Sequence, residues 1–169
     1  GLVEWAYQLT RGVALEETAQ MRAHREQFTS PNARRPAFVL KGDTLSSMTF
    51  WHGKLMSDWA NEWVRYHTDG KGNYVTAAME DTGTLQSLTF LAKAGRVDRD
   101  RVLVLRTASN YDQQRTGISA AQSLREAAGG YAALLPALES AWRVGRVVVE
   151  ELASHWDRYR DRTPSVERH

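Results

Sequence analysis

Three short groups of residues have side chains that could hold a ligand with several hydroxyl groups. Met79-Glu80 places a carboxylate, which can accept one hydrogen bond at each oxygen, beside an apolar thioether. Ser109-Asn110 places a hydroxyl beside an amide that both donates and accepts. The segment Asp43–Gly53 holds a carboxylate, an aromatic pair and a histidine, His52. Together these side chains suit a polyhydroxy ligand that carries a heterocycle.

Each group also has a purely structural interpretation. An acid such as Glu80 suits the first turn of a helix, where the dipole stabilises it, and for the dipeptide alone this interpretation is favoured. An asparagine after a strand can cap its own turn, which leaves the role of Asn110 open. A lone histidine such as His52 is usually structural. We expect Trp51 to be a core residue and Phe50 to stack on a base.

The pattern of apolar runs indicates how these groups are positioned. Runs bounded by turn residues predict strands at Ala37–Lys41, Tyr74–Ala78 and Arg101–Ala108. Ligands of such sheets bind beyond the carboxyl ends of parallel strands. We therefore expect the groups that contain Asp43 and Glu80, together with Ser109-Asn110, to meet at one edge of a sheet.

Helices are predicted between these strands from apolar residues at helical spacing. Their ranges are 2–9, 54–67, 81–94, 119–127 and a long helix from about 136 to 159, and the polar segment 16–27 is compatible with a further helix. The alternation of strands and helices predicts an α/β fold with a mixed, largely parallel sheet. Residues 1–161 are expected to form part of one domain, and residues 162–169 a disordered tail.

The apolar stripes of these helices predict which side chains form the core. Those expected to face inward are Leu85, Leu88 and Leu91, and the tryptophans Trp59, Trp63, Trp142 and Trp156.

Composition narrows the classes of function. The net charge is +2, and 22 basic residues are scattered among 20 acidic ones, so no nucleic-acid partner is expected. The absence of cysteine excludes disulfides, thiolate catalysis and Cys-ligated zinc. No apolar run approaches the roughly 18 residues that span a bilayer. We predict no metal and no cofactor. The sequence does not fix the compartment, and a soluble, periplasmic or exported full-length protein is compatible with it.

Three longer segments together resemble the purine nucleoside permease family. They are Lys41–Gly53, Ala78–Gln86 and Leu103–Asp112. Residues 130–131, 134–139 and 155–161 also fit. The resemblance covers nearly the whole chain and implies that it is the C-terminal portion of a longer protein. That family is in turn similar to the nucleoside phosphorylase and nucleosidase superfamily, which implies a three-layer α/β sandwich, incomplete here on its N-terminal side.

The resemblance also implies roles for individual residues. Met79 and Glu80 would bind the ribose and Phe50 would stack on the base. Ser109-Asn110 stands where many relatives carry Ser-Asp, so Asn110 can donate a hydrogen bond to the purine but cannot protonate it.

Three functions remain open at this point. The first is purine nucleoside binding in an uptake protein. The second is an enzyme that cleaves the N-glycosidic bond with water, or with phosphate as co-substrate, in which Asn110 would be the catalytic residue. The third is a descendant that keeps the fold without binding. A homo-oligomer is compatible with each.

Overall fold

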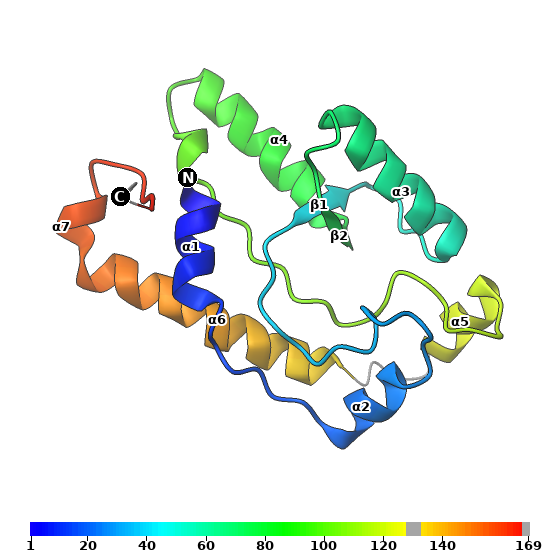
Figure 1. Cartoon of the computed structure of the whole chain (residues 1–169). Coiled ribbons are helices and arrows are strands. Elements are labelled where there is room, and N and C mark those ends of the chain that lie inside the picture. Colours follow the sequence, from blue (N-terminus) through cyan, green and yellow to red (C-terminus); the bar gives the residue numbers. More distant parts are fainter. Residues whose placement is uncertain (128–132, 167–169) are drawn as a thin grey trace.

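One pair of strands lies beside two helices, with further helices away from it, in the computed structural model, which describes residues 1–127 and 133–166 (Figure 1). The described α-helices are α1 (Leu2–Thr10), α2 (Ala19–Arg25), α3 (Lys54–His67), α4 (Glu80–Lys93), α5 (Ala120–Ala127), α6 (Leu134–Ser154) and α7 (Trp156–Tyr159). The strands are β1 (Asp43–Ser46) and β2 (Tyr74–Ala78), and a single 3₁₀ turn, η1, spans Arg99–Arg101.

The two strands and the helix between them form a parallel β1–α3–β2 unit. The register places Asp43 opposite Tyr74 and Ser46 opposite Ala78. Side chains reinforce the pairing, because the hydroxyls of Thr44 and Thr76 lie 2.6 Å apart across the two strands. Helix α3 packs on β2, and α4 begins directly after β2 and packs on β1. The carboxyl ends of both strands therefore lie beside the start of α4.

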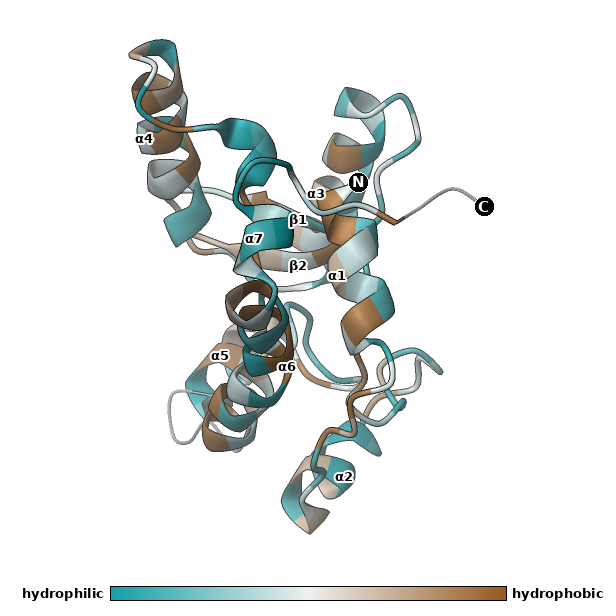
Figure 2. Ribbon diagram, turned by 90° about the vertical axis from the view of Figure 1, so that its left-hand side faces the viewer, coloured by the Kyte–Doolittle hydropathy of each residue, from teal (hydrophilic) through white to brown (hydrophobic). Residues whose placement is uncertain are grey.

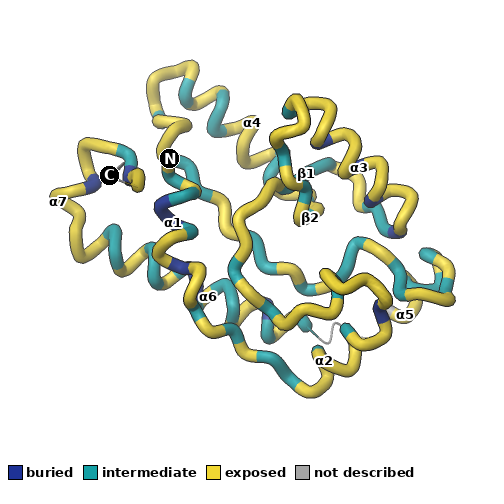
Figure 3. Tube along the Cα trace, in the orientation of Figure 1, coloured by how far each residue is buried: buried dark blue, intermediate teal, exposed yellow. Residues whose placement is uncertain are grey.

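The principal buried cluster lies away from this unit, where α1 meets α6 and α7. Trp5 and Ala6 of α1 are buried with Tyr159 of α7, and the rings of Trp5 and Tyr159 meet edge to face with their centroids 5.5 Å apart. Arg101 secures the same region by donating to the backbone oxygens of Tyr159 and Arg160 at 2.7 Å and 2.6 Å. Buried residues are sparse elsewhere along the trace (Figure 3).

Two of the three predicted strands are not present as strands. Residues 37–41 are irregular, and β1 starts two residues after them, at Asp43. Residues 102–108 follow η1 as an irregular segment. Both segments have strand-like sequences, but a strand also needs a neighbour that accepts its hydrogen bonds, and among the residues described these segments have none. The prediction of Tyr74–Ala78 is confirmed to the residue.

The shorter predicted helices are confirmed, whereas the predicted long helix from about 136 to 159 is interrupted at His155, where α6 ends and α7 begins. Several of the predicted buried faces are wrong. On α3 the buried residues are Ser57, Ala60 and Val64 rather than the aromatic stripe. The side chains expected in the core that are instead exposed are Leu85, Leu91, Trp59, Trp63, Trp142 and Trp156. Hydrophobic residues lie along α4 and α6 in Figure 2. Apolar spacing marks a face that can be covered, and within the described chain no further layer covers these faces.

The structure thus confirms a mixed helix and strand fold with a small parallel sheet. The three-layer sandwich remains a prediction. Pro164, within the predicted tail, is buried, and residues 167–169 lie outside the described part, as do Gly129-Gly130 and Tyr131. Across the ranges 1–127 and 133–166, no helix has the length and apolar character needed to cross a bilayer.

Candidate functional site

The candidate site lies at the carboxyl edge of the β1–β2 pair. The backbone amide of Ser47, just past β1, donates to the carbonyl of Ala78 at 3.0 Å. The hydroxyl of Ser46 accepts from the backbone amide of Thr82 at 3.1 Å, and the two hydroxyls lie 3.0 Å apart. These bonds hold the loop after β1 against the first turn of α4. The loop and Met79 are therefore fixed beside each other.

Glu80 is the first residue of α4 and presents a charged group to solvent at this edge. Its side chain is 74% exposed, and Oε2 accepts from Nη1 of Arg106 at 3.1 Å. The pKa of Glu80 lies below its usual value, because its own backbone amide and then Arg106 stabilise the carboxylate. Met79 precedes it and is 40% exposed. An ionised carboxylate and an accessible thioether thus lie next to each other, as the sequence predicts.

Arg106 is a residue of this site that sequence analysis missed. It forms a two-pronged pair with Asp81, with Nε 3.0 Å from Oδ2 and Nη2 2.5 Å from Oδ1. The Asp81 side chain is only 13% exposed, so this pair is largely shielded and Nη1 is left to reach Glu80. The signal in the sequence is an arginine within the apolar run 102–108, which a buried strand does not tolerate without an acidic partner.

An aromatic hollow of about 370 Å³ adjoins this edge through Ser47. Its lining residues are Ser47, Thr49, Phe50, Trp51, His52, Met56 and Trp59. Phe50 is 57% exposed and has a free ring, whereas Trp51 is half-buried and meets Trp59 edge to face. The structure therefore places Phe50 and His52 in the same hollow, beside the edge that carries Met79 and Glu80.

His52 is held in the hollow by contacts from other segments. Its Nε2 lies 3.1 Å from the hydroxyl of Ser123 in α5. Burial lowers the pKa of His52, and the nearby carboxylate of Asp112 opposes that shift. Asp112 in turn accepts from the phenol of Tyr74 at 2.9 Å, and burial together with this carboxylate raises the pKa of Tyr74. The neutral form of His52 is therefore favoured in the folded protein.

Ser109-Asn110 lies between two points that are fixed against the site. Arg106 precedes it and contacts Glu80, and the carbonyl of Asp112 follows it and accepts from the backbone amide of Gly53 at 2.8 Å. Asn110 is exposed and Ser109 is half-buried. The structure thus brings Ser109-Asn110 to the same region as Glu80, although not at the end of a strand.

Asp43 does not follow a strand, as the sequence predicts it should. It begins β1 rather than following a strand, and it lies opposite Tyr74, four residues from the carboxyl end of β2. At about 3.3 Å per residue, that is roughly 13 Å from the edge that carries Glu80. Its carboxylate accepts from the backbone amide of Asn73 at 2.7 Å. Asp43 therefore closes the turn before β2, and the expected convergence of three strand ends on one edge is wrong.

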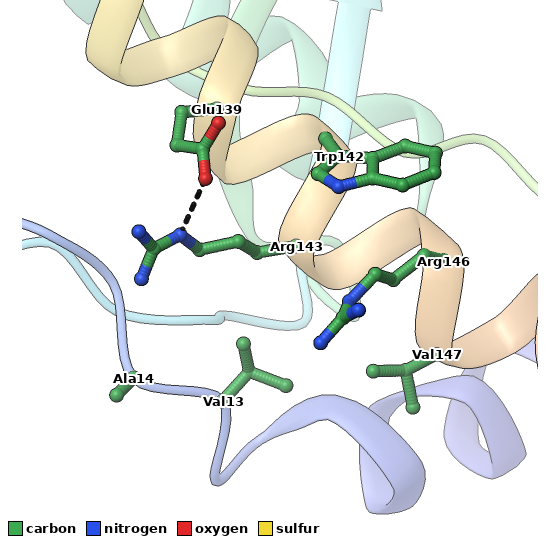
Figure 4. A pocket seen from close by; sticks show the side chains of 7 residues that line it. All are labelled: Val13, Ala14, Glu139, Trp142, Arg143, Arg146 and Val147. Carbon is green, nitrogen blue, oxygen red and sulfur yellow. Dashed lines mark hydrogen bonds and ion pairs between the residues drawn. The ribbon is translucent and has the colours of Figure 1, made fainter.

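A second hollow, of about 490 Å³, lies between α6 and the segment after α1 (Figure 4). Its lining includes Val13, Trp142, Arg143 and Arg146, and none of these is a predicted site residue. Arg143 donates to Glu139 at 2.8 Å and to Glu16 at 3.1 Å, so two acids compensate its charge.

A parallel strand pair with a carboxylate, an exposed aromatic ring and a histidine near its carboxyl edge defines an α/β protein with a candidate site for a small polar ligand. A family model described as purine nucleoside permease matches residues 1–164. The chain therefore belongs to the purine nucleoside permease family.

Individual relatives agree with this assignment. A probable purine nucleoside permease of Schizosaccharomyces pombe is 27% identical over 155 residues, which are 92% of this chain and 44% of that protein. The purine nucleoside permease of Candida albicans is 31% identical over 121 residues, which are 71% of this chain and 29% of the relative. The chain thus spans less than half the length of these relatives. No solved structure matches the chain.

Proposed function

We propose that this chain contributes a purine nucleoside-binding site to a protein of nucleoside uptake. The family and the names of its members support the ligand class. The observation that carries the proposal is the exposed, ionised carboxylate of Glu80, fixed by Arg106 beside the hollow that contains Phe50. A nucleoside is a ligand that combines a diol with a flat aromatic base, and these two groups suit those two parts.

In the proposed complex the ribose lies at the first turn of α4. Arg106 donates to Oε2 of Glu80, and in the proposed complex Oε1 and the remaining capacity of Oε2 accept from the 2′- and 3′-hydroxyls. The thioether of Met79 covers the apolar face of the sugar. Arg106 fixes the direction of the carboxylate before the ligand arrives, which reduces the entropy lost on binding.

The base in this proposal stacks on Phe50, as nucleobases do on exposed aromatic rings. Ser109 and Asn110 provide a hydroxyl and an amide for its polar edge. His52, neutral and hydrogen-bonded to Ser123, is available to the 5′-hydroxyl. Binding in this arrangement requires no cofactor.

Calorimetric titration of the 169-residue chain with inosine and adenosine tests the proposal. Losing the charged acceptor in Glu80→Gln should weaken binding by about 10- to 100-fold. The melting temperature should stay nearly unchanged, because the side chain is exposed. Glu62→Gln is the matched control: its side chain is 69% exposed on α3, and it should bind like the wild type. 2′-Deoxynucleosides should bind more weakly than ribonucleosides.

Equal affinity of Glu80→Gln and the wild type would reject Glu80 as the ribose anchor. The same incubations, with and without phosphate and followed by chromatography for free base, distinguish binding from bond cleavage. Binding without free base is the expected result. Free base that the wild type releases and Asn110→Ala does not would instead identify a nucleoside-cleaving enzyme.

A further inference from the structure

The chain exposes far more surface than a folded protein of its mass. Its accessible surface is 11919 Å². A compact monomer of 19.1 kDa should expose about 8,400 Å², which leaves an excess of about 3,500 Å². Permanent interfaces bury some 2,000 to 5,000 Å² summed over both partners, or about 1,000 to 2,500 Å² on each, so the excess on this one chain is at least that of an obligate contact.

Much of this surface is apolar and is concentrated on one face of α6. Leu135, Leu138, Trp142 and Val149 are between 58% and 75% exposed. At 100° per residue these four positions fall within about 60° of one another around the helix axis, so they form a single stripe. A stripe of this kind is found on helices that pack against another layer of protein.

Two irregular segments expose backbone groups that have no backbone hydrogen-bond partner. In residues 36–42 and 103–109, no backbone amide or carbonyl bonds to another backbone group of the described chain. Both segments have the sequence of strands, and their apolar side chains are also exposed: Phe38 and Leu40 at 42% and 50%, Val104 and Leu105 at 45% and 46%. Segment 103–109 lies near the α6 stripe, because Leu105 approaches within 3.5 Å of the position that a Cβ would take on Gly145.

We propose that the α6 stripe and the segments 36–42 and 103–109 form a docking surface for the remainder of a full-length permease polypeptide. The occupant is the part of the polypeptide that relatives carry outside the region matched here. The matched region is 44% of the Schizosaccharomyces pombe protein, so that part is the remaining 56%, enough to supply both strands and a covering layer. Strands of that part pair with the two segments and extend the β1–β2 sheet, and its apolar side chains cover α6.

This proposal is tested apart from nucleoside binding. Segment 103–109 includes Arg106 and Ser109 of the candidate site, so the variants below change Val104 and Leu138 and leave the site residues in place. A two-stranded parallel sheet is rarely stable alone, since parallel sheets are normally covered on both faces and contain more strands. A second copy of this chain is a weaker occupant, because the relatives already carry additional polypeptide in the same protein.

Co-expression provides the test. The 169-residue chain is produced with the unmatched part of the Schizosaccharomyces pombe relative, and the products are analysed by light scattering and by hydrogen exchange. We expect a one-to-one complex in which amide exchange of residues 36–42 and 103–109 slows by at least about tenfold, as it does when backbone amides become hydrogen-bonded. In the chain alone these amides should exchange rapidly.

Three variants place the contact. Val104→Asp and Leu138→Asp should weaken the complex about tenfold or more while each chain alone melts within a few degrees of the wild type. Leu55→Asp is the matched control, because Leu55 is 81% exposed on α3, outside the proposed surface, and this variant should bind normally. The absence of a complex would overturn the proposal. A homodimer that protects the same segments, or slow exchange at those amides in the isolated chain, would also overturn it.

Discussion

At the scale of residues, the geometry of the candidate site depends on one arginine that donates hydrogen bonds to two acids. Arg106 uses Nε and Nη2 for the shielded Asp81 and keeps Nη1 for the exposed Glu80. The pair with Asp81 fixes the guanidinium, and the guanidinium then orients the exposed carboxylate of Glu80. Arg106 therefore acts on the proposed ligand through Glu80, as a positioning residue.

Replacing Arg106 should alter the pH dependence of nucleoside binding as well as the affinity. The pKa of Glu80 is lowered in the folded protein, so binding is present above that pKa and is lost as pH falls through it. In Arg106→Gln the pKa of Glu80 should rise toward its usual value, because one of its stabilising contacts is gone. Binding should then be lost at a higher pH than in the wild type, in titrations between pH 7 and pH 4.

Arg65→Gln is the control for Arg106→Gln, because Arg65 pairs with the exposed Glu62 at 3.4 Å, outside the site. Its pH profile should match that of the wild type. Identical profiles for Arg106→Gln and the wild type would show that Arg106 has only a structural role.

His52 should make the stability of the fold depend on pH. Burial lowers its folded pKa below the ordinary value, which is about 6.5. The unfolded chain therefore binds a proton more readily than the folded one, and the free energy of unfolding should decrease as pH falls below about 6.5. His52→Gln should flatten this part of the curve, measured by urea unfolding at a series of pH values. His67→Gln serves as a comparison on α3, and an unchanged slope in His52→Gln would contradict the assignment.

At the scale of elements, the sequence predicts helices and β2 well but predicts their surroundings poorly. Helix α3 and strand β2 have the predicted bounds, because helical spacing and a flanking turn are local properties. The buried face of α3 is instead made of Ser57, Ala60 and Val64. Which face is covered depends on what packs against the helix, and the period of apolar residues does not contain that information.

Two tryptophans test this distinction at the element scale. Trp5 is 8% exposed within the cluster of α1 and α7, so Trp5→Ala should destabilise the fold by about 3–5 kcal/mol. Trp142 is 65% exposed on α6, so Trp142→Ala should change the stability of this chain by no more than about 0.5 kcal/mol. Chemical unfolding of both variants measures the difference. Equal losses would mean that the α6 stripe is covered in the isolated chain.

At the scale of the whole molecule, a mixed helix and strand fold could be predicted, and the extent of the sheet could not. The binding roles of Met79, Glu80 and Phe50 follow from the family resemblance and stay predictions; the structure places Phe50 and His52 in one hollow and Glu80 at the carboxyl edge of the strand pair. Residues 37–41 and 101–108 have the apolar character of strands, but strand pairing is made with distant chain segments. The convergence predicted for Asp43 failed for the same reason, because it assumed that the run before it is a strand.

The bonds from Arg101 to the carbonyls of Tyr159 and Arg160 have a consequence for the order of folding. Helix α7 has four residues, too few to nucleate by themselves. It can persist only once α1 supplies Trp5 and η1 supplies the guanidinium. Closure of the 58-residue loop to Arg101 and of the much longer loop to Trp5 must therefore precede it, so α7 should be the last helix of its cluster to form and the first to open.

Arg101→Lys tests this order, because an ammonium has one nitrogen and cannot reproduce the planar fork in which Nη1 and Nη2 donate to separate carbonyls. Amide exchange in residues 157–160 should accelerate by about tenfold, as expected for the loss of one to two hydrogen bonds. Exchange in α3, on the other side of the molecule from this contact, should not change (Figure 1). Uniform acceleration in both helices would show that α7 opens only with the whole fold. Selective acceleration in α7 would show that this helix forms late and is stabilised by a side chain 58 residues earlier in the chain.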